Sequence, residues 1–176
     1  MAELRIGLIG YGAWTREGYL PALRRDGRAR IAAVVAPSQG TRSRAHAELG
    51  SDVILAARFE DLPTHADLDA VMIAVPDAAH ESALRVALAG RAAVFYEPPV
   101  SNQRARMEGV LALLLDSKLV TFADLELGFI PAVARAGEIV ASGALGGVQT
   151  VTIRLQSGWG PLPGNDLSNA NHLSTW

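Results

Sequence analysis

The 176-residue sequence predicts an α/β fold with a doubly wound parallel sheet, because short apolar runs alternate along it with longer helical patterns. The apolar runs are rich in Val, Ile and Ala and lack polar alternation, which is typical of strands buried on both faces. A Gly-x-Gly turn, Gly10 and Gly12, also follows the first run directly and precedes the first helical pattern. Strand–helix alternation at this spacing implies right-handed crossovers that place helices on both faces of the sheet.

The individual elements follow from these runs in chain order. Strands are expected at residues 4–9, 31–35, 70–75, 92–96 and 119–123, with a weaker short strand at 52–55. Helices are expected between them, where apolar residues recur at helical spacing, over residues 13–25, 41–49, 78–89 and 103–117.

The pattern changes after residue 124 and predicts the beginning of a second, α+β domain. Residues 131–142 have helical spacing, and Gly143 stands where a C-terminal cap belongs. Residues 148–155 alternate apolar and polar side chains, as an antiparallel strand with one exposed face does. We expect a first domain at residues 1–124, and a linker helix followed by the first strand and loop of a second domain at residues 125–176. The open edge of that strand predicts that a homo-oligomer or a second chain covers it.

Composition narrows the function classes. Apolar residues make up 49% of the chain and charged residues 19%, and the interspersed charges sum to −2, so we expect no nucleic-acid partner. There is no cysteine and no His/Asp/Glu spacing typical of a metal site, so we expect no bound metal. The longest apolar runs, such as residues 110–115, are too short to span a bilayer, and the N-terminus lacks a signal-peptide pattern. We therefore expect a cytoplasmic protein without membrane contact.

The Gly-x-Gly turn has the form of a dinucleotide-binding loop and makes the predicted fold Rossmann-type. Its first glycine permits a tight turn, and its second lets the backbone approach a pyrophosphate at the start of the next helix. The third position of the pattern, usually Gly or Ala, is Thr15. The residues expected to contact the cofactor here are Gly10, Tyr11, Gly12, Ala13 and Trp14. The alternative is a plain structural turn between strand and helix.

The end of the second strand bears on cofactor choice. An Asp or Glu normally stands there and binds the adenosine ribose hydroxyls, but this chain has Ala36. Ser38, Thr41 and Arg42 follow shortly after and can hydrogen-bond or pair with a 2′-phosphate. We therefore predict NADP, with NAD as the alternative; the competing interpretation is that Arg42 is an ordinary solvated helix residue.

Several runs together resemble the Gfo/Idh/MocA oxidoreductases, which include glucose–fructose oxidoreductase and inositol dehydrogenase. Pro76-Asp77 followed by His80 stands where that family carries Pro-Asn-x-x-His, and Glu97-Pro98-Pro99 stands where it carries Glu-Lys-Pro. Residues 6–12, 19–23 and 139–146 also resemble family motifs, so the similarity extends over essentially the whole chain. Family members are typically about twice as long, with a C-terminal domain that forms the substrate site and often the oligomer interface. The resemblance implies that residues 125–176 are the truncated beginning of this substrate or oligomerisation domain.

The resemblance implies a set of cofactor contacts and two missing catalytic groups. It places Glu97 beside the nicotinamide ribose and implies a cis bond before Pro99. It also implies that Pro98, which has no titratable group, stands at the position of the family's catalytic lysine. If His172 is the family's catalytic histidine, Ser168 occupies the place of its aspartate partner. The remaining residues that the resemblance places near the cofactor are Val75, Pro76, Asp77, His80 and Pro98.

Two functions are consistent with these features. The first is hydride transfer between NAD(P) and a small-molecule substrate, a sugar, polyol or related carbonyl compound, with His172 as the candidate acid/base. The second is a catalytically impaired homologue that senses a nucleotide or binds a partner, which accounts for Pro98 and Ser168 together. A third possibility, a Rossmann shell that binds no nucleotide, requires Tyr11, Trp14 or Thr15 to fill the cleft.

Overall fold

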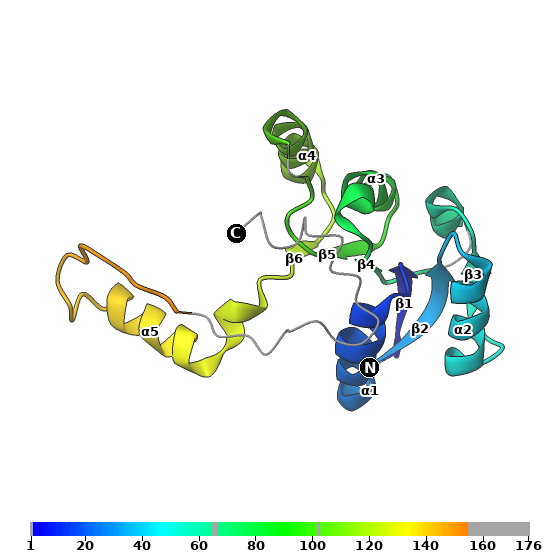
Figure 1. Cartoon of the computed structure of the whole chain (residues 1–176), viewed down its shortest axis with the longest axis horizontal. Coiled ribbons are helices and arrows are strands. Elements are labelled where there is room, and N and C mark those ends of the chain that lie inside the picture. Colours follow the sequence, from blue (N-terminus) through cyan, green and yellow to red (C-terminus); the bar gives the residue numbers. More distant parts are fainter. Residues whose placement is uncertain (1, 65–66, 102, 155–176) are drawn as a thin grey trace. The chain divides into compact units, whose positions relative to one another are not determined.

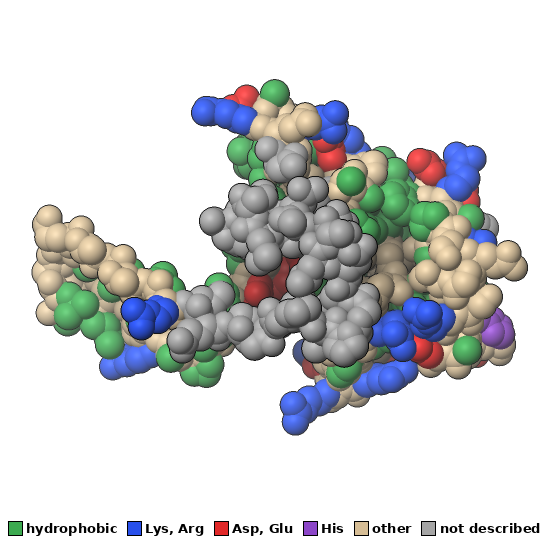
Figure 2. Space-filling view, viewed as in Figure 1, with side chains coloured by type: hydrophobic (Ala, Val, Ile, Leu, Met, Phe, Trp, Pro, Cys, Tyr) green, Lys and Arg blue, Asp and Glu red, His purple; other side chains and the backbone are tan. Residues whose placement is uncertain are grey.

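A computed structural model describes residues 2–64, 67–101 and 103–154. The chain divides into two compact units, residues 1–125 and 126–176, and each is described by itself. Within the described ranges, no helix combines the length and apolar character needed to cross a membrane. On the face drawn in Figure 2, Lys and Arg side chains are scattered rather than gathered into one patch.

The first unit is built on a six-stranded sheet in which every neighbouring pair is parallel, in the order β3-β2-β1-β4-β5-β6 (Figure 1). The strand order reverses between β1 and β4, the two strands at the centre. This is the doubly wound Rossmann topology that the sequence predicts, and a crevice outside the carboxyl ends of the strands is expected at the reversal. The strands are β1 (Leu4–Ile9), β2 (Ala29–Val35), β3 (Ile54–Ala56), β4 (Ala70–Ile73), β5 (Ala93–Tyr96) and β6 (Thr121–Ala123).

Helices cover the sheet and divide the hydrophobic core into two clusters. One cluster includes Leu84 of α3, Val110 of α4 and Leu62 of η2, all fully or almost fully buried. The other includes Leu20 of α1 and Ala45 of α2. The chain therefore has a core on each side of the sheet, as a parallel sheet requires. The helical elements are η1 (Thr15–Tyr19), α1 (Leu20–Asp26), α2 (Gln39–Leu49), η2 (Phe59–Thr64), α3 (Asp77–Leu88) and α4 (Arg104–Asp116).

The first helix differs from a regular α-helix in its second turn. Residues 13–26 are helical throughout, but η1 (Thr15–Tyr19) is a π-helical turn. Pro21 follows at the beginning of α1 and has no N–H with which to bond the carbonyl of Glu17. A π turn widens the helix locally at such a break and is often found at functional sites.

The second unit contains η3 (Glu126–Phe129) and α5 (Pro131–Ala141). Pro131 begins α5, and Gly143 has a φ of 73° just beyond its end, which agrees with the predicted helix and cap. The strand predicted at residues 148–155 is not formed over its described part, residues 148–154, where no regular secondary structure is present. Apolar–polar alternation makes a segment suitable for a strand, but a strand needs a partner ladder. The described residues 148–154 therefore offer no open strand edge for an oligomer, and the homo-oligomer stays a prediction.

Tyr11 belongs to the core and not to an open cleft. Its side chain is 2% exposed, and its hydroxyl donates to Glu48 Oε2 of α2 at 2.9 Å. The same carboxylate accepts from Arg16, whose Nη2 lies 2.7 Å from Oε1 and whose Nε lies 3.0 Å from Oε2. Burial, together with the hydrogen bond to Glu48, raises the pKa of Tyr11 to about 12. This cluster fixes the turn after β1 to α2.

The raised pKa of Tyr11 predicts a loss of stability at high pH. Because the folded pKa lies above the ordinary value of 10.0, the contribution is complete below that value and is lost as pH rises toward 12. Urea denaturation at about pH 9 and about pH 11.5 should show a larger fall in the free energy of unfolding for the wild type than for Tyr11→Phe. Equal falls for the two proteins would show that ionisation of Tyr11 is not linked to folding.

Candidate functional site

The candidate site lies at one edge of the sheet, where the central strands end. Ala74 N donates to Ile9 O at 2.9 Å, and Gly10 N donates to Val35 O at 2.9 Å. The turns that leave β1, β2 and β4 therefore meet at the point where the strand order reverses. This is the position at which doubly wound folds bind ligands.

Gly10 is required by its backbone conformation and by its neighbour. Its φ is 99°, a value that side-chain-bearing residues rarely adopt. A Cβ at this position would lie 2.0 Å from the carbonyl oxygen of Ala74. Glycine alone therefore lets the end of β1 turn while in contact with the end of β4.

Gly12 has the opposite surroundings. A Cβ added there would meet no described atom within 4 Å beyond the two chain neighbours, and both Gly12 and Ala13 are exposed. The helix begins at this point, since Arg16 N donates to Gly12 O at 3.2 Å, and amides in a first helical turn have no helical acceptor. An open backbone at a helix start fits the pyrophosphate of a dinucleotide.

The side chains around Gly12 leave this approach open. Tyr11 points to Glu48, and Thr15 is fully buried with its Oγ1 3.4 Å from Gly10 O. The Trp14 ring packs edge-on against Tyr19, at 6.0 Å between centroids, and lies beside Gly18. Among the described residues, the three side chains that could have filled the cleft are therefore directed elsewhere. Tyr11 and Trp14 are left with their backbone amides to offer to a cofactor.

The residues after β2 are arranged around two backbone carbonyls. Arg42 Nη1 donates to Ala36 O at 2.6 Å and to Pro37 O at 2.7 Å. Ser38 caps α2, where its hydroxyl accepts from Thr41 N at 3.4 Å. The structure thus brings the three predicted residues together beside Ala36, where the usual acid is absent.

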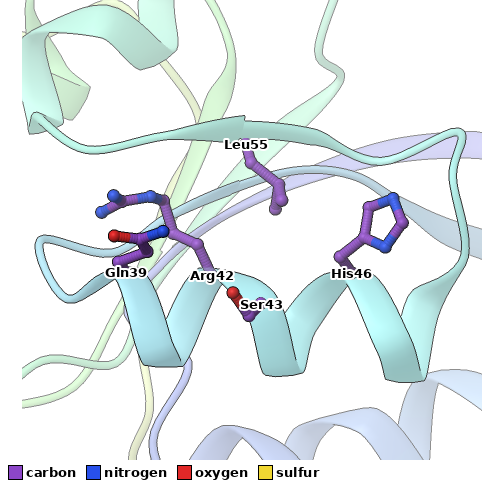
Figure 3. Close-up of a pocket in the computed structure, with 5 residues that line it drawn as sticks. All are labelled: Gln39, Arg42, Ser43, His46 and Leu55. Carbon is purple, nitrogen blue, oxygen red and sulfur yellow. The ribbon is translucent and has the colours of Figure 1, made fainter.

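A shallow depression of about 390 Å³ adjoins this group on α2. In Figure 3, Leu55 points from β3 toward the helix, and the side chains of Gln39 and Arg42 extend to the same side of the helix. The depression is lined by Gln39, Arg42, Ser43, His46 and Leu55. Arg42 therefore faces both the end of β2 and an open surface. Sequence reasoning missed Gln39 and Ser43, whose helical spacing from Arg42 and His46 was the available signal.

The ends of β4 and β5 are joined through His80. Its ring is 4% exposed, with Nδ1 3.0 Å from Pro99 O and Nε2 against Val75 O. The Pro98-Pro99 bond is cis, which confirms the prediction. The ring thus faces the protein's own backbone, and not an open cleft where it could act as an acid or base. Pro76 is exposed beside it, and the side chain of Asp77 lies outside what the structure describes.

Tyr19 and Asp124 form a further contact at this edge that sequence reasoning missed. The Tyr19 hydroxyl donates to Asp124 Oδ2 at 2.9 Å, across 105 positions of sequence. Burial raises the pKa of Tyr19, and the carboxylates of Glu97 and Asp124 act in the same direction. Tyr19 therefore remains a hydroxyl donor to Asp124 near neutrality. The only sequence signal was that Asp124 directly follows a predicted strand.

The predicted catalytic histidine belongs to a part of the chain that the structure does not describe. His172 and Ser168 lie outside the described residues, so His172 stays a prediction. Glu97 and Pro98 are both partly buried after β5. Within residues 2–64, 67–101 and 103–154, no group of three or more metal-ligating side chains is close enough to hold a metal ion.

Solved structures share this fold. An apo scyllo-inositol dehydrogenase from Lactobacillus casei has a TM-score of 0.74 at 23% identity, over 82% of this chain and 43% of that chain. An oxidoreductase from Thermotoga maritima has a TM-score of 0.73 at 26% identity, over 82% and 44%. A super-repressor mutant of Gal80p from Saccharomyces cerevisiae has a TM-score of 0.71 at 20% identity, over 82% and 40%. The chain thus spans less than half the length of these proteins.

A comparison with curated protein sequences finds no significant match. Residues 4–124, however, match the sequence model of the GFO_IDH_MocA oxidoreductase family, described as an NAD-binding Rossmann fold. The match covers β1 to β6, including the glycine turn and the cis-proline turn. The chain therefore belongs to the Gfo/Idh/MocA oxidoreductase family, and its first unit is the family's NAD-binding Rossmann domain.

Proposed function

We propose that this chain is the cofactor-binding part of an NAD(P)-dependent oxidoreductase that acts on a sugar, polyol or related carbonyl compound. The observation that carries the proposal is the open backbone at Gly12, where an added Cβ would meet no described atom within 4 Å. It lies at the strand-order reversal, beside a Gly10 that no other residue can replace without a clash. These two glycines together are what a pyrophosphate site of this fold needs.

Three groups of residues would each bind one part of the cofactor. The backbone of residues 10–14 would hold the pyrophosphate, and Ser38, Thr41 and Arg42 would hold the adenosine ribose end. Val75, Pro76, His80, Glu97 and Pro98 lie on the β4–β5 side, where the nicotinamide end would bind. When bound, the nicotinamide supplies the hydride acceptor or donor of the reaction.

Pro98 cannot donate or accept the proton of the reaction, so another group has to do so. Proline carries no titratable group, and general acid–base help is worth about 10²–10⁴ in rate. In our proposal His172, a water molecule or a residue outside this segment moves the proton. The polyol substrate class is supported by a related structure, that of scyllo-inositol dehydrogenase from Lactobacillus casei with bound NAD(H) and scyllo-inositol.

We propose further that NADP is preferred over NAD. The guanidinium of Arg42 is held at the end of β2 by the carbonyls of Ala36 and Pro37. These two bonds start from one nitrogen, so the guanidinium has further N–H groups with which to donate to a phosphate. No carboxylate occupies the Ala36 position to repel a 2′-phosphate.

A second candidate function is a nucleotide-sensing or partner-binding homologue without the reaction. It is favoured by Pro98, which stands in the place of the family's lysine. The fold is also shared by a protein described as a transcriptional regulator, Gal80p from Kluyveromyces lactis, at 17% identity and a TM-score of 0.70. A nucleotide-sensing homologue would share the dinucleotide site with the oxidoreductase and would differ from it in turnover.

Gly12→Ala should separate cofactor binding from folding. An added Cβ meets no described atom within 4 Å, so the free energy of unfolding should change by less than about 0.5 kcal/mol. The methyl group would occupy the approach to the backbone, so the Kd for NADH and NADPH should rise about tenfold or more, as measured by calorimetric titration. Gly137→Ala in α5, whose Cβ would meet no described atom within 4 Å beyond its chain neighbours and the backbone of its own helix, is the matched control. Unchanged affinity in Gly12→Ala would remove the basis of the proposed site.

Arg42→Gln tests the cofactor preference. It removes the charge at the end of β2, so the Kd for NADPH should rise about tenfold, as expected when a hydrogen bond to a charged group is lost. The Kd for NADH should change by less than about twofold. Arg44→Gln removes a charge from an exposed position on the same helix and should leave both constants unchanged. A clear preference of the wild type for NADH would contradict the NADP assignment.

Turnover distinguishes the two candidate functions. An oxidoreductase should change NADPH absorbance with a panel of polyols and sugars, whereas the non-catalytic homologue should bind cofactor without turnover. If the second candidate is correct, Pro98→Lys alone should restore little activity, because Ser168 also stands at the aspartate position if His172 is the family's histidine. Strong dehydrogenase activity in that single variant would count against the non-catalytic function.

A further inference from the structure

His80 occupies an unusual place between two strand ends. It lies in the first turn of α3, and its imidazole ring is 4% exposed. Nε2 faces the carbonyl oxygen of Val75, which follows β4, and Nδ1 lies 3.0 Å from the carbonyl oxygen of Pro99, in the turn after β5. One buried side chain therefore bridges two backbone segments that are separate in the sequence.

The imidazole ring forms at least one hydrogen bond in this bridge. Carbonyl oxygens only accept hydrogen bonds, whereas a neutral imidazole donates from one nitrogen and an imidazolium donates from both. The ring therefore bonds at least one of the two carbonyls in either protonation state. The helix that carries the ring, α3, is itself held in place, because its residues Ala83, Leu84 and Ala87 are buried in the core. The position of the ring is thus set by α3, and the ring in turn sets the distance between the two segments.

The two bridged segments border one half of the crevice. In a doubly wound fold, each mononucleotide-binding half takes one end of a dinucleotide, and the adenosine ribose lies at the end of β2. The other end of the cofactor then lies over β4 and β5, whose exits carry Val75 and the Pro98-Pro99 turn. A change in the spacing of these exits would alter the nicotinamide end of the site and leave the adenosine end as it is.

We propose that His80 is a positioning residue for the nicotinamide end of the cofactor, acting through the carbonyls of Val75 and Pro99. It does not itself touch the cofactor; it holds the exits of β4 and β5 at the separation that the nicotinamide riboside needs. The inference rests on the proposed function, because it requires that a dinucleotide binds at this edge of the sheet.

The test compares a ligand that fills both halves of the crevice with one that fills only the adenosine half. NADH and NADPH include the nicotinamide, whereas ADP lacks it. His80→Leu removes both ring nitrogens, and His80→Gln keeps one side-chain group that can donate a hydrogen bond. We expect the Kd for NADH and NADPH to rise about tenfold in His80→Leu and less in His80→Gln, with the Kd for ADP within about twofold of wild type in both. If His80→Leu does not fold, His80→Gln alone has to show a higher Kd for NADH and NADPH together with an unchanged Kd for ADP.

Two controls separate positioning from general damage. Val110→Ala removes part of a fully buried side chain in the core cluster that holds α3, and it should lower the free energy of unfolding. It should not change the Kd for NADH and NADPH relative to the Kd for ADP. Arg91→Gln changes an exposed residue just before β5 and should alter neither the stability nor the binding of either kind of ligand. Equal weakening of ADP and NADH binding in the His80 variants, or no weakening of either, would overturn the inference while the proposed function stands. A wild-type protein that binds neither ADP nor the dinucleotides would overturn the proposed function and this inference with it.

Discussion

The end of β1 can lie directly against the end of β4 because Gly10 has no Cβ. That atom would lie 2.0 Å from the carbonyl oxygen of Ala74, and the residue has a φ of 99°, so the contact excludes every other amino acid without a shift of backbone. This close approach joins the two halves of the sheet at their carboxyl ends. It also directs the chain into the turn that leaves Gly12 open at the beginning of the first helix. The position of the candidate cofactor site follows from this contact.

Around this contact, side chains tie the remaining segments of the site together. The Tyr11–Glu48–Arg16 cluster joins the glycine turn to α2, and Arg42 closes the exit of β2. On the other side of the reversal, His80 joins the exits of β4 and β5, and Tyr19 bonds Asp124 after β6. The backbone near Gly12 stays exposed while its surroundings are held by side-chain hydrogen bonds, which is the preorganised arrangement that tight ligand binding favours.

Local patterns in the sequence predicted most of the first unit. The first strand has the predicted bounds, residues 4–9, and the predicted parallel sheet is present, because apolar runs and glycine turns act over a few residues. Contacts between distant residues could not be predicted in the same way. Tyr19 and Asp124 are 105 positions apart, and the burial of Tyr11 depends on where α2 packs. The strand expected at residues 148–155 shows the same limit, because alternation reveals a suitable segment but not its partner.

The central claim is that backbone amides at the start of the first helix bind the diphosphate of a nicotinamide dinucleotide. The most direct measurement is the change in backbone amide resonances of ¹⁵N-labelled protein on saturation with NADPH or NADH. Our account predicts that the largest changes occur from Gly10 to Trp14, with smaller changes at the exits of β2 and β5. Largest changes confined to other elements, or no change on addition of either cofactor, would contradict it.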